Sequence, residues 1–140
     1  MIVSEMDERA IDGLRFVGDL QVYESPTVSL YLNEAEDKLI LFFKTSQCAS
    51  NNEKFIVTSV SSDRLLKYMN RELPLVSLFK KGTYLFAGII NGVICFETSK
   101  HSSPYNLLRK AGKFDPDFCY DRIRILSFLK EFIDIKEVII

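Results

Sequence analysis

Histidine is scarce in this chain, which limits the kinds of catalysis it can support. His101 is the single histidine among 140 residues. A Ser-His-acid or Cys-His pair would have to use it, because no other side chain has an unperturbed pKa near neutrality. It lies in a polar stretch ahead of a predicted helix and has no orienting partner nearby in the sequence, so we expect a solvated loop residue.

Cysteine is also sparse. Cys48, Cys95 and Cys119 are odd in number and far apart in sequence, which excludes a disulfide framework and a zinc site and favours a reducing compartment. We expect Cys95 in the core of a strand and Cys119 in the core of a helix. Cys48 is the candidate for an exposed thiol, but a reactive thiolate needs a nearby cation or helix N-terminus, and Lys44 is the nearest base in sequence.

Long apolar runs and ligand-binding motifs are missing. The longest apolar stretches, such as Tyr84–Ile90, are far shorter than a membrane span, and Met1–Asp12 is acidic and lacks the apolar region of a signal peptide. No glycine-rich phosphate loop, GxSxG, HExxH or CxxC pattern occurs. The acidic triple Glu34, Glu36 and Asp37 lacks the glycine and downstream glutamate of an EF-hand, so we expect a solvated turn and predict no metal or cofactor.

What the chain does contain is the composition of a folded core. Apolar residues make up 47% of it, including 11 Phe. Its length suits one domain, so we predict a single α+β domain over residues 1–140, with residues 1–12 a frayed end or a short amphipathic segment. The net charge is −1, although residues 1–40 hold nine acidic residues against three basic ones. We expect folding to cancel most of this asymmetry.

A strand that runs into a capped helix is the clearest local pattern. Phe55–Val60 is rich in β-branched and aromatic residues. Ser61 and Ser62 can accept hydrogen bonds from the first turn of a helix, and Asp63 suits its positive end. This junction favours an α+β fold.

Alternation predicts a hairpin ahead of this junction. Thr27–Asn33 has apolar residues on one side and polar ones on the other, as in a half-buried strand, and the apolar stretch Lys38–Lys44 is its predicted partner. We expect this strand to begin after Pro26, which cannot donate to a ladder. Before it, Leu14–Val17 is predicted as a short edge strand that is ended by glycine and aspartate at positions 18 and 19.

Turn residues place the next elements. The small polar residues of Ser46–Lys54 predict a loop. Asn91-Gly92 suits a type I′ turn and predicts a hairpin over Thr83–Phe96. Pro74 opens a predicted short helix that continues to Phe79.

Proline and glycine also delimit the C-terminal helices. Ser103-Pro104 opens one helix that ends before Gly112, and Asp115-Pro116 opens a second, predicted over Pro116–Ile133. A strand over Arg122–Ile125 is the competing interpretation. We predict Ile135–Ile140 as a last strand or a docked tail.

Together these patterns predict an antiparallel sheet of about five strands, with two or three helices packed largely on one face. The predicted core comprises Val28, Leu30, Leu41, Phe43, Ile56, Val57, Leu65, Leu66, Leu85, Ile89, Ile94, Phe96, Ile123, Leu126 and Leu129.

One stretch combines bases with aromatic residues, as proteins that bind nucleic acid do. Bases can contact phosphates while aromatic rings stack on nucleobases. The candidate nucleic-acid-binding residues are Tyr105, Arg109, Lys110, Lys113, Arg122 and Arg124, with Phe114 among them as an expected core residue. Arg109 and Lys110 also suit a helix C-terminus for electrostatic reasons alone.

The middle of the chain has the order strand, turn, strand, loop, a strand running into a helix, and a short Leu-rich segment, at Val22–Pro26, Val28–Phe43, Phe55–Val60, Ser61–Leu66 and Leu73–Phe79. In these segments it resembles a family of small bacterial proteins known only as a domain of unknown function. The resemblance implies a bacterial or phage protein of the cytoplasm and brings no catalytic residues with it.

Three functional hypotheses follow. The leading one is a non-catalytic interaction or regulatory protein that binds a protein partner or self-associates through an exposed sheet edge or through Ile135–Ile140. The second is a nucleic-acid-binding module that uses the stretch at residues 105–124. The third is a small enzyme that uses His101 or Cys48.

Overall fold

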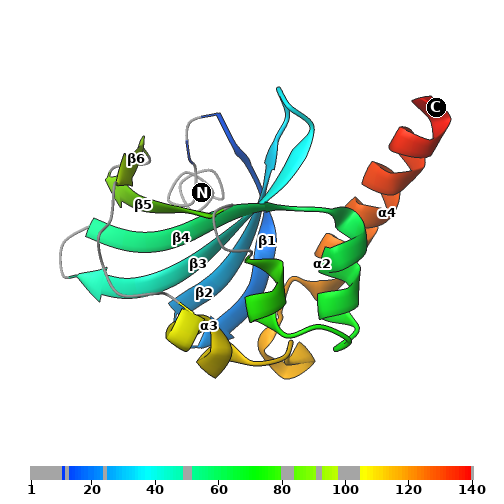
Figure 1. Ribbon diagram of the computed structural model, residues 1–140. Coiled ribbons are helices and arrows are strands. Elements are labelled where there is room, and N and C mark those ends of the chain that lie inside the picture. The colour runs from blue at the N-terminus through cyan, green and yellow to red at the C-terminus, as the bar shows by residue number, and fades with distance from the viewer. Residues whose placement is uncertain are drawn as a thin grey trace, which may run out of the picture.

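A six-stranded antiparallel sheet forms the body of the protein, with the helices gathered on one of its faces (Figure 1). The computed structural model describes residues 11, 13–23, 25–48, 52–79, 84–90, 93–97 and 105–139. The strands adjoin in chain order: β1 (Arg15–Tyr23), β2 (Ser25–Asn33), β3 (Lys38–Cys48), β4 (Asn52–Val60), β5 (Tyr84–Ile90) and β6 (Val93–Glu97). The helical segments are α2 (Ser62–Met69), the 3₁₀ turn η1 (Leu75–Leu78), α3 (Tyr105–Ala111), the 3₁₀ turn η2 (Pro116–Phe118) and α4 (Arg122–Ile139). The predicted α+β class is confirmed.

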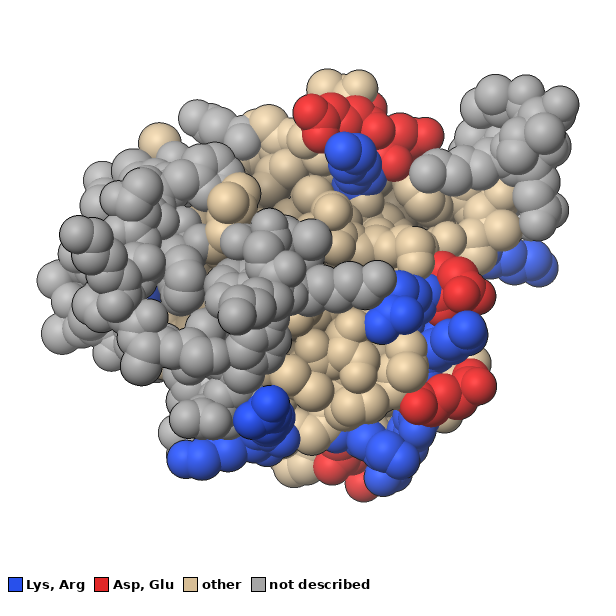
Figure 2. Space-filling model, viewed as in Figure 1, with Lys and Arg blue, Asp and Glu red and all other residues tan. Residues whose placement is uncertain are grey.

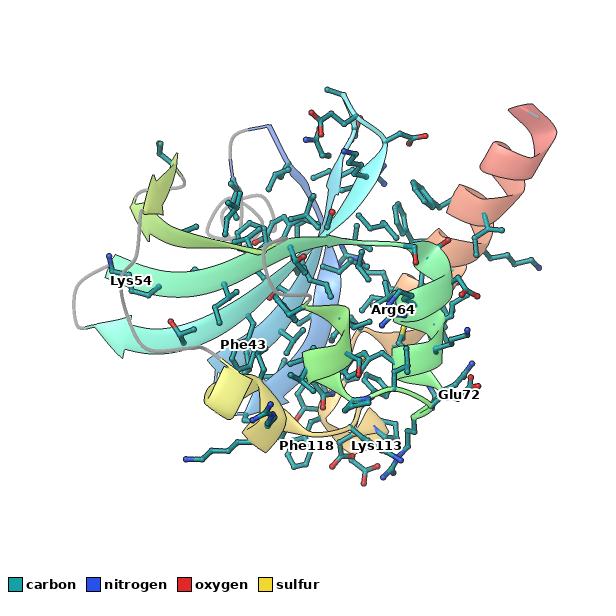
Figure 3. The ribbon with its side chains drawn as sticks, in the orientation of Figure 1. Phe43, Lys54, Arg64, Glu72, Lys113 and Phe118 are labelled. Carbon is teal, nitrogen blue, oxygen red and sulfur yellow. The ribbon has the colours of Figure 1, made fainter. Side chains whose placement is uncertain are left out.

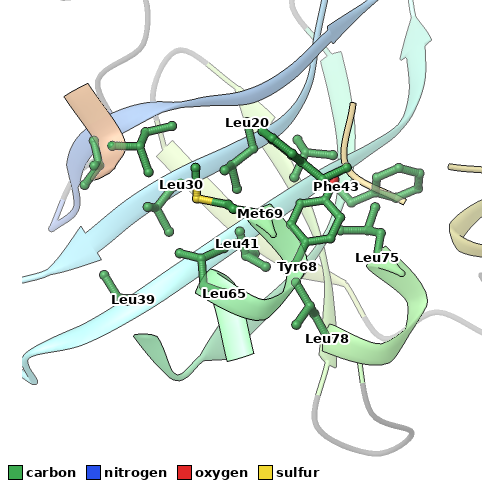
Figure 4. Close-up of a cluster of buried hydrophobic side chains, with 14 of the residues drawn as sticks. Leu20, Leu30, Leu39, Leu41, Phe43, Leu65, Tyr68, Met69, Leu75 and Leu78 are labelled. Atoms are coloured by element: carbon green, nitrogen blue, oxygen red, sulfur yellow. The ribbon is translucent and has the colours of Figure 1, made fainter. Parts of the chain in front are cut away.

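The main core lies between the sheet and the helices (Figure 4). Leu30 lies opposite Leu41, and Phe43 lies opposite Ile56, so that apolar side chains of β2, β3 and β4 form one continuous surface. Leu30, Leu41 and Ile56 are wholly buried. The side chains that pack on this surface from α2 and η1 are Leu65, Tyr68, Met69, Leu75 and Leu78.

The opposite face of the sheet is buried as well. Tyr31, Phe42 and Phe55 form a row of edge-to-face ring contacts across β2, β3 and β4, with centroids 4.8 and 5.7 Å apart. Ser29 and Tyr31 are 5% and 4% exposed. The prediction that β2 is half-buried is therefore wrong, because its alternation separates two buried faces rather than a core face from a solvent face.

β1 is continuous, so the predicted break at Gly18 and Asp19 is wrong. Bulges between Phe16 and Gly18 and between Asp19 and Gln21 keep the ladder with β2 in place. A bulge absorbs an extra residue without ending the pairing, and that possibility is invisible in the alternation of the sequence.

β2 begins at Ser25 and contains Pro26, so the prediction that it starts after the proline is also wrong. Pro26 lies opposite Val22 of β1, whereas pairing with β3 begins at Val28. Because β2 pairs only with β1 at Pro26, the missing N–H of the proline removes no hydrogen bond to β3.

The third connection is shorter than predicted. The expected loop Ser46–Lys54 is wrong, because Gln47 pairs with Glu53 and Cys48 pairs with Asn52. A bulge between Lys44 and Ser46 lets these polar residues continue the ladder. The β5–β6 pairing agrees with the predicted Thr83–Phe96 hairpin, whose turn at 91–92 lies outside the described residues.

The capped helix after β4 is confirmed. The Ser61 hydroxyl accepts a hydrogen bond from the N–H of Arg64 at 3.2 Å. Arg64 in turn donates from Nη2 to the carbonyl of Ser77 at 2.7 Å, which joins α2 to η1 (Figure 3). The helix ends with Arg71 in the left-handed conformation, at φ 64°.

The C-terminal region differs from the prediction. One helix over Pro116–Ile133 is wrong: η2 ends at Phe118, and α4 begins at Arg122 and extends through Ile139. Cys119 has an extended backbone (φ −116°, ψ 92°), and this residue separates the two elements. The alternative strand at Arg122–Ile125 is also wrong, and residues 135–139 belong to α4 rather than to a strand or tail.

The predicted core is correct in the centre of the sheet and wrong at three positions. Leu85, Ile123 and Leu126 are 54%, 82% and 36% exposed. Leu66 is partly buried, and the side chains at positions 89, 94 and 96 lie outside the described part of the structure. The buried members are Val28, Leu30, Leu41, Phe43, Ile56, Val57, Leu65 and Leu129.

Candidate interaction surface

The side chains on which the enzyme hypothesis depends lie outside the described part of the structure. His101 lies outside the described residues. Cys48 is the last residue of β3, and its side chain is not among those described. The same holds for the side chain of Cys95 in β6. The hypothesis therefore stays a prediction.

Cys119 is buried, although in an extended segment and not in the predicted helix. Its Sγ donates to the carbonyl of Asp19 at 3.5 Å. Burial, with the Asp121 carboxylate nearby, raises the pKa of this thiol to about 11. Because the thiolate is the nucleophilic form, Cys119 is a poor nucleophile at neutral pH.

The basic stretch is divided between two parts of the molecule. Arg109, Lys110 and Lys113 are exposed in and just after α3, and Figure 2 shows Lys and Arg side chains along this lower edge. The guanidinium of Arg124 lies 5.4 Å from the ring centre of Phe16, which packs with the cluster on the sheet face away from α3.

The other members of that stretch have mixed surroundings. Arg122 is exposed at the start of α4, and the side chain of Tyr105 is not described. Phe114 is 1% exposed, as predicted, and packs edge-to-face on Tyr68 with centroids 5.4 Å apart. The structure therefore exposes Arg109, Lys110 and Lys113 in and after α3 and sets Arg124 apart, against Phe16.

The acidic residues lie at the tip of the β2–β3 hairpin. Glu34, Glu36 and Asp37 are all exposed, and Figure 2 shows carboxylates gathered at the top of the molecule with a cation beneath them. Lys38 Nζ lies 3.8 Å from a Glu36 carboxylate oxygen. Among the described residues no group of His, Cys, Asp or Glu is arranged to hold a metal ion.

A recess of about 300 Å³ lies beneath this tip. Its lining residues are Asp37, Lys38, Leu39, Ser59, Val60, Ser61, Ser62 and Phe132. The cation of Lys38 and the amino end of α2 would suit an anion, but Asp37 shares the recess and the Ser61 hydroxyl already caps the helix. With groups of both charges in its lining, the recess does not indicate a class of ligand.

The outer edge of β1 is closed by the segment between α3 and α4. Gln21 Oε1 accepts from the N–H of Asp115 at 3.0 Å, and Gln21 Nε2 donates to the carbonyl of Asp115 at 2.8 Å. Two residues earlier in β1, the Asp19 N–H donates to Asp121 Oδ2 at 2.8 Å. The Asp121 carboxylate and the Cys119 thiol thus occupy the N–H and the carbonyl of Asp19, which a further strand could otherwise pair, and the Gln21 side chain holds the segment against this edge.

Three exposed aromatic residues lie beside this covered edge, and we call them the aromatic end: Tyr23, Phe118 and Tyr120. The Tyr23 and Phe118 rings pack with centroids 4.6 Å apart, and Figure 3 places Phe118 at the lower margin of the molecule. They are 41% and 37% exposed, and Tyr120 is 75% exposed. The Tyr23 hydroxyl donates to Gln21 Oε1 at 3.0 Å, and burial with the Asp115 carboxylate raises the Tyr23 pKa.

The aromatic end was missed by sequence reasoning. The sequence patterns assign Tyr23 to no element, and they place Phe118 and Tyr120 inside the predicted helix Pro116–Ile133. The available signal is the density of aromatic and basic residues at 105–124, which the sequence analysis interprets as a nucleic-acid-binding stretch, a helix C-terminus and a buried Phe114.

Comparisons of the chain with protein-family models, curated proteins and solved structures gave no match. Among the described helices, none has the length and apolar content that a membrane crossing requires.

Proposed function

We propose that this chain is a non-catalytic protein that acts by binding another protein at the aromatic end. The observation that carries the proposal is the exposure of Tyr120, 75%, two residues after Phe118, whose partly exposed ring packs with that of Tyr23. Aromatic side chains offer a large apolar area at a low cost in side-chain entropy and are enriched among the residues that dominate binding energies. Exposed Arg122 follows them in sequence, and arginine shares this enrichment.

The aromatic end is held rigidly, which favours binding. The Gln21–Asp115 pair fixes the start of the segment, and the hydrogen bonds of Cys119 and Asp121 to Asp19 fix its end. A surface that is already ordered loses little conformational entropy when a partner binds.

Affinity capture with the full chain tests the proposal. We expect Tyr120→Ala to fold normally, because the ring is largely exposed, and to weaken binding of captured bacterial proteins at least about tenfold. Ser127→Ala, an exposed change on α4, is the matched control and should retain them. Equal capture by the two variants, or no specific capture by the wild type, would overturn the proposal.

Nucleic acid is the alternative partner, and the exposure of Arg109, Lys110 and Lys113 along one edge favours it. Binding would be strongly salt-dependent, because phosphate contacts release counterions. Replacing Arg109 and Lys110 with Ala should weaken binding of a labelled oligonucleotide and lower its salt slope, and Arg124→Ala should add little because that side chain lies apart. An unchanged oligonucleotide affinity after replacement of Arg109 and Lys110 would remove the alternative.

The expected source stays part of the proposal. The odd number and wide spacing of the three cysteines favour a reducing compartment such as the cytoplasm. The resemblance to a bacterial domain of unknown function favours a bacterial or phage source.

A further inference from the structure

Carboxylates border the aromatic end. Residues 115–121 hold three acidic residues and no basic one, while Lys113 precedes this run and Arg122 follows it. The side chain of Asp117 is exposed, and that of Asp115 is partly buried. Within the described part of the chain, neither of these two carboxylates forms an ion pair. Their charge is therefore available to a partner.

Hydrogen bonds hold these carboxylates close to the packed rings. Gln21 Oε1 accepts from both the Tyr23 hydroxyl and the N–H of Asp115, each at 3.0 Å, so that Tyr23 and Asp115 lie around one oxygen atom. Burial, and then the Asp115 carboxylate, raise the pKa of Tyr23, as expected for a negative charge near its hydroxyl. Asp115 Oδ1 accepts from the N–H of Asp117 at 3.0 Å, which fixes the turn that leads into Phe118.

Elsewhere the chain places its own arginines on aromatic rings. The guanidinium of Arg15 lies 5.9 Å from the ring centre of Phe128, and that of Arg124 lies 5.4 Å from the ring centre of Phe16. Both of these rings are partly buried. No cation among the described residues covers the rings of the aromatic end in this way. These rings are therefore open to a cation from another molecule.

We infer that the aromatic end binds an arginine in a basic segment of the partner protein, an inference that rests on the function proposed above. The guanidinium stacks on the Tyr23–Phe118 ring pair and donates to the carboxylates of Asp115 and Asp117. Arginine suits both contacts, because its planar group stacks on aromatic faces and donates in pairs to carboxylates. The ammonium of lysine is more strongly hydrated and acts as a point charge, so it fits this surface less well.

An acidic segment of a partner fits this surface poorly. It could pair with Lys113 or Arg122, but it would bring its own carboxylates towards Asp115 and Asp117. It would also leave the exposed ring faces without a cation. The combination of aromatic rings and carboxylates thus selects a basic partner.

Fluorescence anisotropy of a labelled hexa-arginine peptide with the full chain tests the inference. We expect saturable binding, with a dissociation constant at least about threefold lower than that of hexa-lysine, which has the same charge but no planar group. Asp117→Asn should raise the dissociation constant for hexa-arginine at least about fivefold. Glu36→Gln, which neutralises an exposed carboxylate at the β2–β3 tip, is the matched control and should leave it unchanged.

Phe118→Leu tests the contribution of the ring. Leucine keeps an apolar side chain but has no aromatic face, so this variant should lose the preference for hexa-arginine over hexa-lysine. If Phe118→Leu loses its circular dichroism signal, Asp117→Asn decides alone, because that side chain is exposed.

The other results contradict the inference or the proposed function separately. Equal affinity of the wild type for the two peptides, or an unchanged hexa-arginine affinity in Asp117→Asn, overturns the arginine site. If Tyr120→Ala still loses the captured proteins in that case, the proposed function stands and the chemistry assigned to the partner is wrong. A wild type that prefers hexa-arginine as expected but captures no protein overturns the proposed function and supports the arginine site.

Discussion

Gly18 of β1 and Ile125 of α4 approach so closely that no side chain fits between them. A Cβ placed on Gly18 would lie 2.7 Å from Ile125 Cγ1 and 3.1 Å from the Cβ of Asp121. Ile125 is wholly buried, and Asp121 is anchored to the N–H of Asp19. The start of α4 is therefore docked on β1 at a position where the strand must have hydrogen in place of a side chain.

Gly18→Ala should destabilise the protein by about 1–3 kcal/mol, the usual cost of overpacking a core. The added methyl group cannot be accommodated by rotation of a flexible chain end, because Ile125 Cγ1 is next to its own Cβ. Urea denaturation followed by circular dichroism measures the change in the free energy of unfolding.

A double-mutant cycle isolates the contact. Ile125→Ala alone should cost about 2–5 kcal/mol through the cavity it leaves. In that background Gly18→Ala should cost much less than in the wild type, because the two closest atoms, Ile125 Cγ1 and Cδ1, are gone and only the Cβ of Asp121 remains close. Additive effects would show that Gly18 matters for some reason other than Ile125.

This contact also explains where the sequence misled. Gly18 and Asp19 look like strand breakers, and their role depends on a helix more than 100 positions away. The same contact decides which face of α4 is turned toward the core. The apolar residues of α4 lie on several faces, and docking at Gly18 buries Ile125 in place of Ile123. The spacing of apolar residues along the helix cannot identify the buried face. The Ser61 cap and the central strands, in contrast, could be predicted from neighbouring residues in the sequence.

The amide of Gln21 is predicted to hold the segment that carries the aromatic end. Gln21→Leu should cost about 1–3 kcal/mol, because the N–H and carbonyl of Asp115 lose their partners. Tyr23→Phe, which removes a single hydrogen bond to Gln21, should cost less than about 1.5 kcal/mol. Thermal unfolding of the two variants compares them, and a smaller loss for Gln21→Leu than for Tyr23→Phe would contradict this role.

Arg71 is predicted to reduce stability where it stands. It occupies the left-handed position after α2, where the N–H groups of Arg71 and Glu72 donate to the carbonyls of Tyr68 and Lys67. Glycine is the preferred residue at this position of a helix end. Arg71→Gly should therefore stabilise the protein by about 0.5–1 kcal/mol, with a higher melting temperature.

Asp37 provides the comparison for Arg71. It also has a positive φ, 59°, in the β2–β3 turn. Aspartate tolerates this conformation better than arginine does, so Asp37→Gly should raise the melting temperature by less. A loss of stability in Arg71→Gly would mean that the exposed guanidinium makes a favourable interaction that exceeds its backbone cost.

The exposure of the aromatic end could not have been predicted from local patterns either. Phe118 and Tyr120 flank Cys119, whose extended backbone turns the chain out of its helical path so that its thiol and Asp121 reach the edge of β1. A continuous helix would have placed the same residues on different faces. Burial of Phe114, by contrast, followed from its aromatic character and was predicted correctly.

Cys119 is predicted to make stability fall at alkaline pH. Burial first, and then the Asp121 carboxylate, raise the pKa of its thiol from 9.0 to about 11, so the folded protein favours the protonated form. Its stabilising contribution is complete below pH 9 and is lost as the pH rises from 9 through 11. Burial also raises the pKa of Tyr68, so part of the alkaline loss belongs to that residue.

Cys119→Ser separates the two contributions. Serine keeps a donor to the Asp19 carbonyl but does not titrate in this range. Between pH 8.5 and pH 11 the variant should therefore lose less stability than the wild type, by an amount on the order of 1 kcal/mol. Urea denaturation at both pH values measures this difference; an equal loss in the two proteins would show that the Cys119 thiol has an ordinary pKa in the folded state.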